Sequence, residues 1–200
     1  MDPAYYVAAG SLKARAFQME TVANNLANAD TVGYKTEQSF FSLFNKATAS
    51  GRNLPFSKYV NDGTVLAARA VDPSQGTTKL TGKSLDVAIE GNAFLVVSTP
   101  QGVQVTRDGR LKLGEGGELQ SLDGSPVLGK NGQSMKINAS GQPISISPDG
   151  TISQGTTVLG QLELKAYANS SALTRVGSNR YDATGLAEAP VKATVSQGYL

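Results

Sequence analysis

The residues whose types and spacing best suit chemistry are three carboxylates in a glycine-rich stretch. They are Glu115, Glu118 and Asp123. Two carboxylates can act as acid and base only where a partly dry pocket separates their pKa values. Because glycines surround Glu115 and Glu118, exposed turn side chains are the simpler interpretation. The spacing also departs from that of a calcium-binding loop, so we predict no catalytic and no metal-binding residues.

A second candidate is the stretch GTTKLTGKS, residues 76–84. A phosphate-binding loop needs four residues between its glycines and a helix after them, whereas here there are five and a strand pattern follows. The sequence contains no cysteine and no histidine, which excludes disulfides, thiol nucleophiles and histidine bases within it. We therefore predict no cofactor and no enzyme. A carboxylate hydrolase stays as an alternative that requires a pocket holding two of the three acids.

Composition limits the remaining classes of protein. The 200 residues suffice for one domain or two small ones, and 40% hydrophobic with 17% charged residues is typical of a folded chain. The net charge is +2 and the basic residues are scattered, so we predict no nucleic-acid partner. No apolar run is long enough to enter a membrane, and the first residues lack the pattern of a cleaved signal peptide.

Residues 1–35 are predicted to form one helix and its exit. Pro3 suits the first helical position, while Asn28, Asp30 and Gly33 favour an end. Between them runs a heptad pattern that we call the heptad seam: Tyr5, Ala9, Leu12, Ala16, Met19, Ala23 and Leu26. So narrow a stripe favours another helix as its partner. The partner is the sheet, another molecule, or sequence beyond Leu200.

The rest of the chain predicts a β-rich fold. Residues 36–84 read as an irregular or extended connector, with a short helix near Phe40–Phe44. Residues 85–167 show two-residue alternation, a continuous apolar run at 94–97 and hairpin-type turn pairs such as Asp108-Gly109 and Asp123-Gly124, which predict a β domain. Residues 168–200 read as a return segment. The expected fold is mainly β with an N-terminal α-helix and a compact antiparallel domain, sandwich or barrel-like.

Three stretches resemble the rod and hook proteins of the bacterial flagellum. The helix exit carries an Asn-Asn-Leu-Ala-Asn and Thr-x-Gly-aromatic-basic signature: Asn24, Asn25, Leu26, Ala27, Asn28, Thr31, Gly33, Tyr34 and Lys35. A second stretch resembles the opening of the rod proteins' β domain: Leu85, Asp86, Val87, Ala88, Ile89, Gly91, Phe94, Arg107, Asp108 and Gly109. Residues 197–200, QGYL, resemble the motif that precedes the family's C-terminal helix. Within these stretches the sequence departs from the family at Ala93, where the family usually has glycine.

The resemblance implies a structural subunit of the basal-body rod. Such a subunit polymerises with itself and other rod proteins into the drive shaft that carries torque from motor to hook. The opening MDPAYYV and the short middle segment favour the proximal rod, and a distal rod or hook-type subunit is the alternative. The family's export apparatus would carry it to a position across the periplasm without a cleaved signal.

The family pattern also places a second heptad helix beyond Leu200, against the first. This sequence stops before that helix and is expected to be trimmed. Without it, we expect the N-terminal segment to be largely disordered in the free monomer. A different class of protein remains: a periplasmic β-domain binding module that dimerises through its N-terminal helix.

Overall fold

The computed structural model describes residues 3–44, 63–72, 74–138, 141–177 and 179–200, with side chains from residue 8 to 39 and from 71 onward in these ranges. The chain divides into two compact units. One consists of Met1–Asp30 and Thr36–Asp72, here called the helix unit, and the other of Thr31–Lys35 and Pro73–Leu200, here called the β unit.

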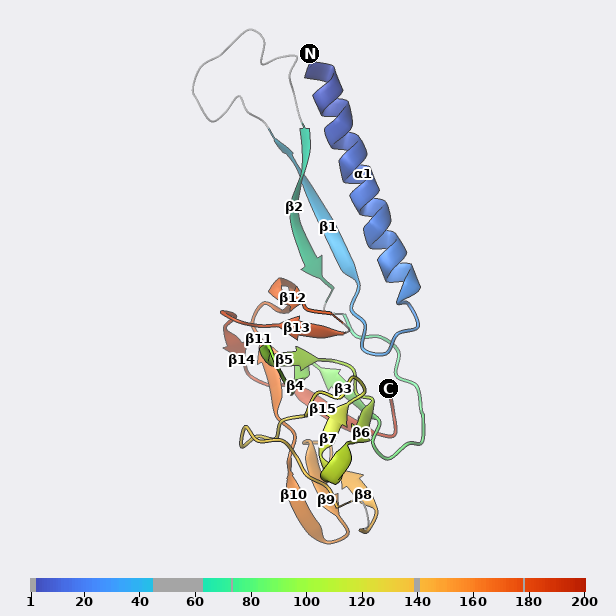
Figure 1. Ribbon diagram of the computed structural model, residues 1–200, viewed down its shortest axis with the longest axis vertical. Coiled ribbons are helices and arrows are strands. Elements are labelled where there is room, and N and C mark those ends of the chain that lie inside the picture. Colours follow the sequence, from blue (N-terminus) through green and yellow to red (C-terminus); the bar gives the residue numbers. More distant parts are fainter. Residues whose placement is uncertain (1–2, 45–62, 73, 139–140, 178) are drawn as a thin grey trace. The chain divides into compact units, whose positions relative to one another are not determined.

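The helix unit begins with α1 (Pro3–Ala27), followed by β1 (Glu37–Phe44) and β2 (Gly63–Val71). The two strands pair antiparallel into a ribbon, and α1 runs beside this ribbon (Figure 1). The expected short helix near Phe40–Phe44 is wrong, because these residues belong to β1. A register shift between Phe40 and Phe41 explains the missing alternation: the bulge changes the phase of the strand in its middle.

The β unit contains short strands paired antiparallel (Figure 1). Its largest sheet has the strand order β12-β13-β5-β4-β11-β14. The strands of this sheet, in the same order, are Thr174–Arg175, Arg180–Asp182, Gly102–Thr106, Ala93–Thr99, Leu164–Tyr167 and Glu188–Ala189.

Three smaller sheets complete the unit. They pair β3 (Val87–Gly91) with β15 (Ala193–Gln197), β6 (Leu111–Leu113) with β7 (Leu119–Ser121), and β9 (Thr151–Gln154) with both β8 (Ile144–Ile146) and β10 (Thr157–Gln161). Two short 3-10 turns lie at Glu115–Gly117 and Ser170–Ala172. The fold is thus mainly β with an N-terminal helix, as the sequence predicted.

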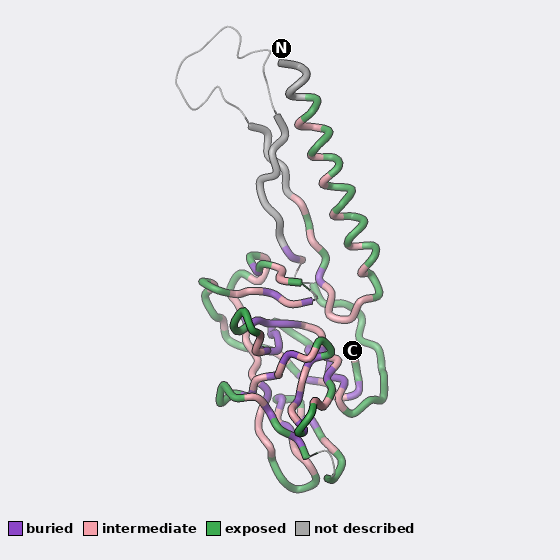
Figure 2. Tube along the Cα trace, in the orientation of Figure 1, coloured by how far each residue is buried: buried purple, intermediate pink, exposed green. Residues whose placement is uncertain are grey.

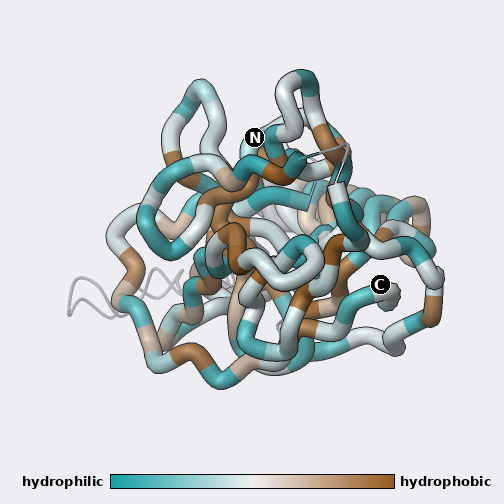
Figure 3. Tube along the Cα trace, turned by 90° about the horizontal axis from the view of Figure 1, so that it is seen from below, coloured by the Kyte–Doolittle hydropathy of each residue, from teal (hydrophilic) through white to brown (hydrophobic). Residues whose placement is uncertain are grey.

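The hydrophobic core lies in the β unit, and Figure 2 shows buried residues in most of its strands. One face of the large sheet supplies Ala93, Leu95 and Val97, which pack with residues of the smaller sheets such as Leu119 and Ile152. Figure 3 shows hydrophobic and hydrophilic stretches following one another along the chain. The continuous run 94–97 is confirmed as a strand buried on both faces.

The unit boundaries differ from the segments that the sequence suggested. The expected return segment 168–200 supplies four strands, which pair with β5, β11 and β3 of the same unit. The Asp108-Gly109 pair also makes no hairpin, because β5 pairs with β4 and β13 while β6 pairs with β7. Both differences come from pairing between strands far apart in sequence, which local patterns do not encode.

Candidate assembly site

The heptad seam lies on an exposed face of α1 (Figure 2). Its large side chains are the most exposed, with Leu12, Met19 and Leu26 at 73%, 71% and 76% exposure. Ala9, Ala16 and Ala23 of the seam are exposed as well, and the side chain of Tyr5 lies outside the described residues. Among the described side chains, α1 therefore displays a continuous apolar stripe.

A different face of α1 meets the ribbon. The helix residues of intermediate burial between Ala14 and Asn28 include Phe17, Thr21 and Asn25. Since successive helical residues turn by about 100°, this set lies roughly opposite the heptad seam. The Thr21 hydroxyl is 3.0 Å from that of Ser39 in β1. Packing on the ribbon thus leaves the seam uncovered.

Asn25 of the signature joins α1 to the first residue of β1. Its side-chain amide donates to the backbone carbonyl of Glu37 (2.9 Å) and accepts from the Glu37 backbone N–H (3.1 Å). The Asn28 side chain donates to the carbonyl of Asn24 (2.8 Å), which also accepts the Asn28 backbone N–H (3.2 Å). Asn25 therefore joins the helix to β1 and Asn28 adds a bond at the helix end, while the side chain of Asn24 is exposed.

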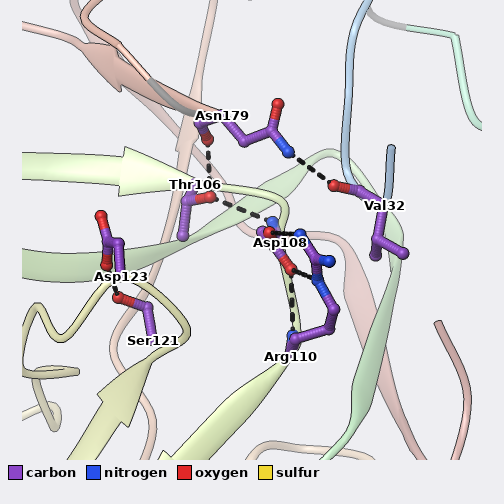
Figure 4. Close-up of polar contacts among 7 residues, drawn as sticks. All are labelled: Val32, Thr106, Asp108, Arg110, Ser121, Asp123 and Asn179. Atoms are coloured by element: carbon purple, nitrogen blue, oxygen red, sulfur yellow. Dashed lines mark hydrogen bonds and ion pairs between the residues drawn. The ribbon is translucent and has the colours of Figure 1, made fainter. Parts of the chain in front are cut away.

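The second half of the signature belongs to the β unit. We call Thr31–Lys35 the tongue, because the chain leaves the helix unit for these five residues and then returns. Asn179 donates to the carbonyl of Val32 (2.7 Å), and the Asn179 carbonyl accepts from the hydroxyl of Thr106 (2.6 Å) (Figure 4). Asn179 has a positive φ of 54°, a conformation that asparagine tolerates better than most residues.

Gly33 is required where the tongue meets the β unit. Its φ is +70°, and a Cβ at this position would lie 2.5 Å from the backbone carbon of Arg107 and 2.5 Å from the backbone nitrogen of Asp108. Any side chain here would add a steric clash to backbone strain.

Tyr34 and Lys35 fix the end of the tongue. The guanidinium of Arg175 lies 4.2 Å from the centre of the Tyr34 ring and donates to the carbonyl of Lys35. Such a cation over an aromatic face is attracted by the ring quadrupole. Lys35 is buried at 6% exposure, and its ammonium donates to the carbonyl of Ser74. The Tyr34 ring and the Lys35 ammonium therefore both contact other residues of the β unit.

The stack continues across the sheet face opposite the main core. Arg175 also lies over Tyr181 (5.6 Å), and the Tyr181 ring meets Phe94 edge-on at 6.1 Å. On the other side of Phe94, the Arg107 guanidinium lies 4.7 Å from the ring centre. Burial lowers the pKa of Arg107 because it removes water from the charge. The stack joins Tyr34 of the first signature to Phe94 and Arg107 of the second.

The second signature holds its own backbone in place. Arg107 donates to the carbonyls of Ile89 (3.2 Å) and Gly91 (2.5 Å). Asp108 pairs with Arg110 (2.5 Å), and the hydrogen bond to Asp108 raises the pKa of Arg110.

Close backbone approach explains two glycines of this signature. A Cβ on Gly109 would overlap the carbonyl oxygen of Val87, and one on Gly91 would overlap that of Lys192. Asp86, Val87, Ala88 and Ile89 are buried, and Leu85 packs against the core.

Of the three carboxylates, Glu115 is exposed, and Glu118 and Asp123 contact different residues. Glu118 accepts from Gln120 (3.2 Å), whereas Asp123 pairs with Arg180 (2.8 Å) and accepts from Ser121 (Figure 4). Burial alone would raise the pKa of Asp123, but the hydrogen bonds from Ser121 and Ser125 and the charge of Arg180 outweigh it and lower that pKa. Among the described residues, no cluster of three metal-ligating side chains occurs.

The sequence alone did not reveal Asn179 and Arg175, which hold the tongue, or the role of Gln197. The Gln197 amide accepts from the N–H of Ile146 (3.1 Å) and donates to the carbonyls of Ser84 (2.8 Å) and Ile144 (3.0 Å). A side chain that bonds distant backbone leaves no periodic signal. Only the QGYL resemblance marked Gln197.

Comparisons with known proteins agree with both signatures. Residues 6–35 match the family model described as flagella basal body rod protein. Residues 88–154 match the flagellar hook protein FlgE/F/G D1 domain. The described part of the chain has no helix with the length and hydrophobicity to cross a membrane.

Individual relatives extend these matches along the chain. The flagellar basal-body rod protein FlgF of Mesorhizobium japonicum is 30% identical over 90% of this chain and 71% of its own length. FlgG of Buchnera aphidicola subsp. Acyrthosiphon pisum is 31% identical over 97% of this chain and 79% of its own length. FlgF of Caulobacter vibrioides is 33% identical over 100% of this chain and 81% of its own length.

The fold and the matched regions define a structural protein of the bacterial flagellum. More narrowly, the chain belongs to the family of flagellar basal-body rod proteins. Because this family is structural, the carboxylate-hydrolase alternative no longer applies.

Proposed function

We propose that this chain is a proximal rod subunit of the flagellar basal body, and that it polymerises with itself and other rod proteins into the torque-carrying drive shaft. The observation that carries the proposal is the heptad seam, which α1 displays to solvent with Leu12, Met19 and Leu26 more than two-thirds exposed. Isolated exposed leucines are common, but a heptad stripe on the face opposite the ribbon fits a helical partner.

The seam supports open helical growth. Contacts between unlike surfaces of successive subunits build a filament when the rotation does not close. In this proposal the seam residues, from Tyr5 to Leu26, make the axial contacts, and the helix that carries them becomes fully ordered on assembly. The β unit covers the outside of the rod, in the periplasm.

The choice of the proximal rod rests on the opening sequence and the short middle segment. Relatives named FlgF and FlgG match at similar identity, and one FlgF aligns with the entire chain. A distal rod subunit is therefore the second candidate. Delivery by the flagellar export apparatus, and the absence of nucleic acid among the partners, belong to the same proposal.

The test replaces seam leucines in the living cell. A strain deleted for this gene receives Leu12→Asp, Leu26→Asp, or the control Gln18→Asp, which adds the same charge at an exposed position off the seam. We expect the leucine variants to lose incorporation at least tenfold and the control to swim normally, because burying an unpaired carboxylate in an apolar contact is costly.

Electron microscopy of the basal bodies separates the candidates. In the deletion strain, rods that are missing near the motor support a proximal subunit, and rods that stop farther out support a distal one. Circular dichroism of the purified variants checks that the β unit stays folded. Normal incorporation of Leu12→Asp would contradict the role of the seam. A closed dimer of the wild-type protein in sedimentation would favour the binding module.

A further inference from the structure

The tongue occupies the β unit as a bound peptide would. It contributes five residues, Thr31–Lys35, and both neighbouring segments of chain belong to the helix unit. The β unit meets it with side chains from distant positions: Asn179, Arg175 and the backbone around Arg107. A short segment held by residues this far away in sequence is recognised through its own chemistry.

The β unit contacts the residues of the tongue in different ways. Val32 is held through its carbonyl, so its side chain is not specified by that contact. Gly33 has no room for a Cβ. Tyr34 offers a ring to the guanidinium of Arg175. The Lys35 side chain is buried, and its ammonium donates a hydrogen bond to the carbonyl of Ser74. A segment that makes all these contacts therefore has the sequence pattern x-Gly-aromatic-Lys.

The receiving residues are held independently of the tongue. The Asn179 carbonyl accepts from Thr106, whose hydroxyl also accepts from the Asp108 N–H (3.0 Å) (Figure 4). Arg107 is fixed by Ile89 and Gly91, and Tyr181 is fully buried beneath Arg175. A receptor whose parts are already in place loses little entropy on binding.

We propose that the β unit carries a peptide-binding site for the x-Gly-aromatic-Lys segment, and that the tongue is its intramolecular ligand. The site contacts only the residues of this motif and does not depend on the chain around it. A peptide with the same three features therefore binds in trans whenever the tongue is displaced. In the intact chain the tongue prevails, because a tethered ligand acts at a high effective concentration.

The experiment uses the full chain with its tongue displaced. Gly33→Val adds a branched side chain where none fits, and a fluorescent peptide of residues 29–37 then serves as the probe. We expect fluorescence anisotropy to show peptide binding to the Gly33→Val chain at least tenfold tighter than to the wild-type chain. Near-ultraviolet circular dichroism confirms folding. A second chain, with Tyr34→Ala and Lys35→Ala together, displaces the tongue without a clash and should bind the peptide equally.

Matched controls test the contacts. A peptide carrying Gly33→Val should not bind, whereas one carrying Tyr34→Phe should, since it keeps the ring. Asn179→Asp in the displaced chain keeps size and backbone preference but removes the donor to Val32, so affinity should fall at least tenfold. Failure of the peptide to bind either folded displaced chain, or equal binding after Asn179→Asp, would overturn the proposal.

Discussion

The two adjacent asparagines Asn24 and Asn25 should respond in opposite directions to the same substitution. Asn25 bonds both backbone groups of Glu37, whereas the Asn24 side chain is exposed in the last turn of the same helix. We therefore expect Asn25→Ala to weaken the junction between α1 and β1. Asn24→Ala should leave that junction intact and slightly strengthen the helix.

The magnitude follows from the two hydrogen bonds. Leaving a partly buried backbone donor and acceptor unpaired costs about 1–3 kcal/mol. Alanine recovers about 0.5 kcal/mol through its higher helix propensity. The net loss for Asn25→Ala is about 0.5–2.5 kcal/mol, a change of about 2- to 70-fold in the opening equilibrium. For Asn24→Ala only the propensity gain remains.

Native-state hydrogen exchange measures this difference at the Glu37 amide, which donates directly to Asn25. Exchange at Glu37 should accelerate by about 2- to 70-fold in Asn25→Ala and slow slightly in Asn24→Ala. Amides of β4 in the β unit serve as an internal reference. Equal effects of the two substitutions would refute the role assigned to Asn25.

Two further predictions concern the β unit. Gln197→Ala removes the side chain that bonds three backbone groups, so it should lower the free energy of unfolding by about 2–3 kcal/mol and Tm by about 6–10 °C. The control Gln101→Ala, in an exposed turn, should leave the thermal melting curve unchanged. The lowered pKa of Asp123 means that its stabilisation is complete above the unfolded value of about 3.9 and is lost as pH falls through the folded value. Asp123→Asn should therefore flatten the dependence of Tm on pH between about pH 5 and pH 2, and an unchanged slope would contradict this.

The sequence predicted the helix and most strands of the β unit because their patterns are local. The heptad spacing predicted a single helix, and α1 ends at Ala27, close to the expected end signals. Alternation at 87–89 and the apolar run at 94–97 became β3 and β4. Each of these signals depends only on neighbours within one element.

The parts that were not predicted depend on contacts across the chain. The bulge in β1 hides its strand pattern, and its partner β2 begins only at Gly63. The tongue is held by Arg175 and Asn179, far away in sequence. The signature residues were identified through resemblance, and the structure supplies a physical reason for Asn25, Asn28, Gly33 and others.

The edges of the largest sheet have a consequence for how the protein can aggregate. Both edge strands, β12 and β14, are two residues long, and Glu188 of β14 pairs with Lys165. Long bare edges add strands from other molecules without limit, as in amyloid. In this sheet that route is nearly closed, which matters for a protein proposed to polymerise: crowded copies can assemble in the ordered way without also joining through the edges of the largest sheet.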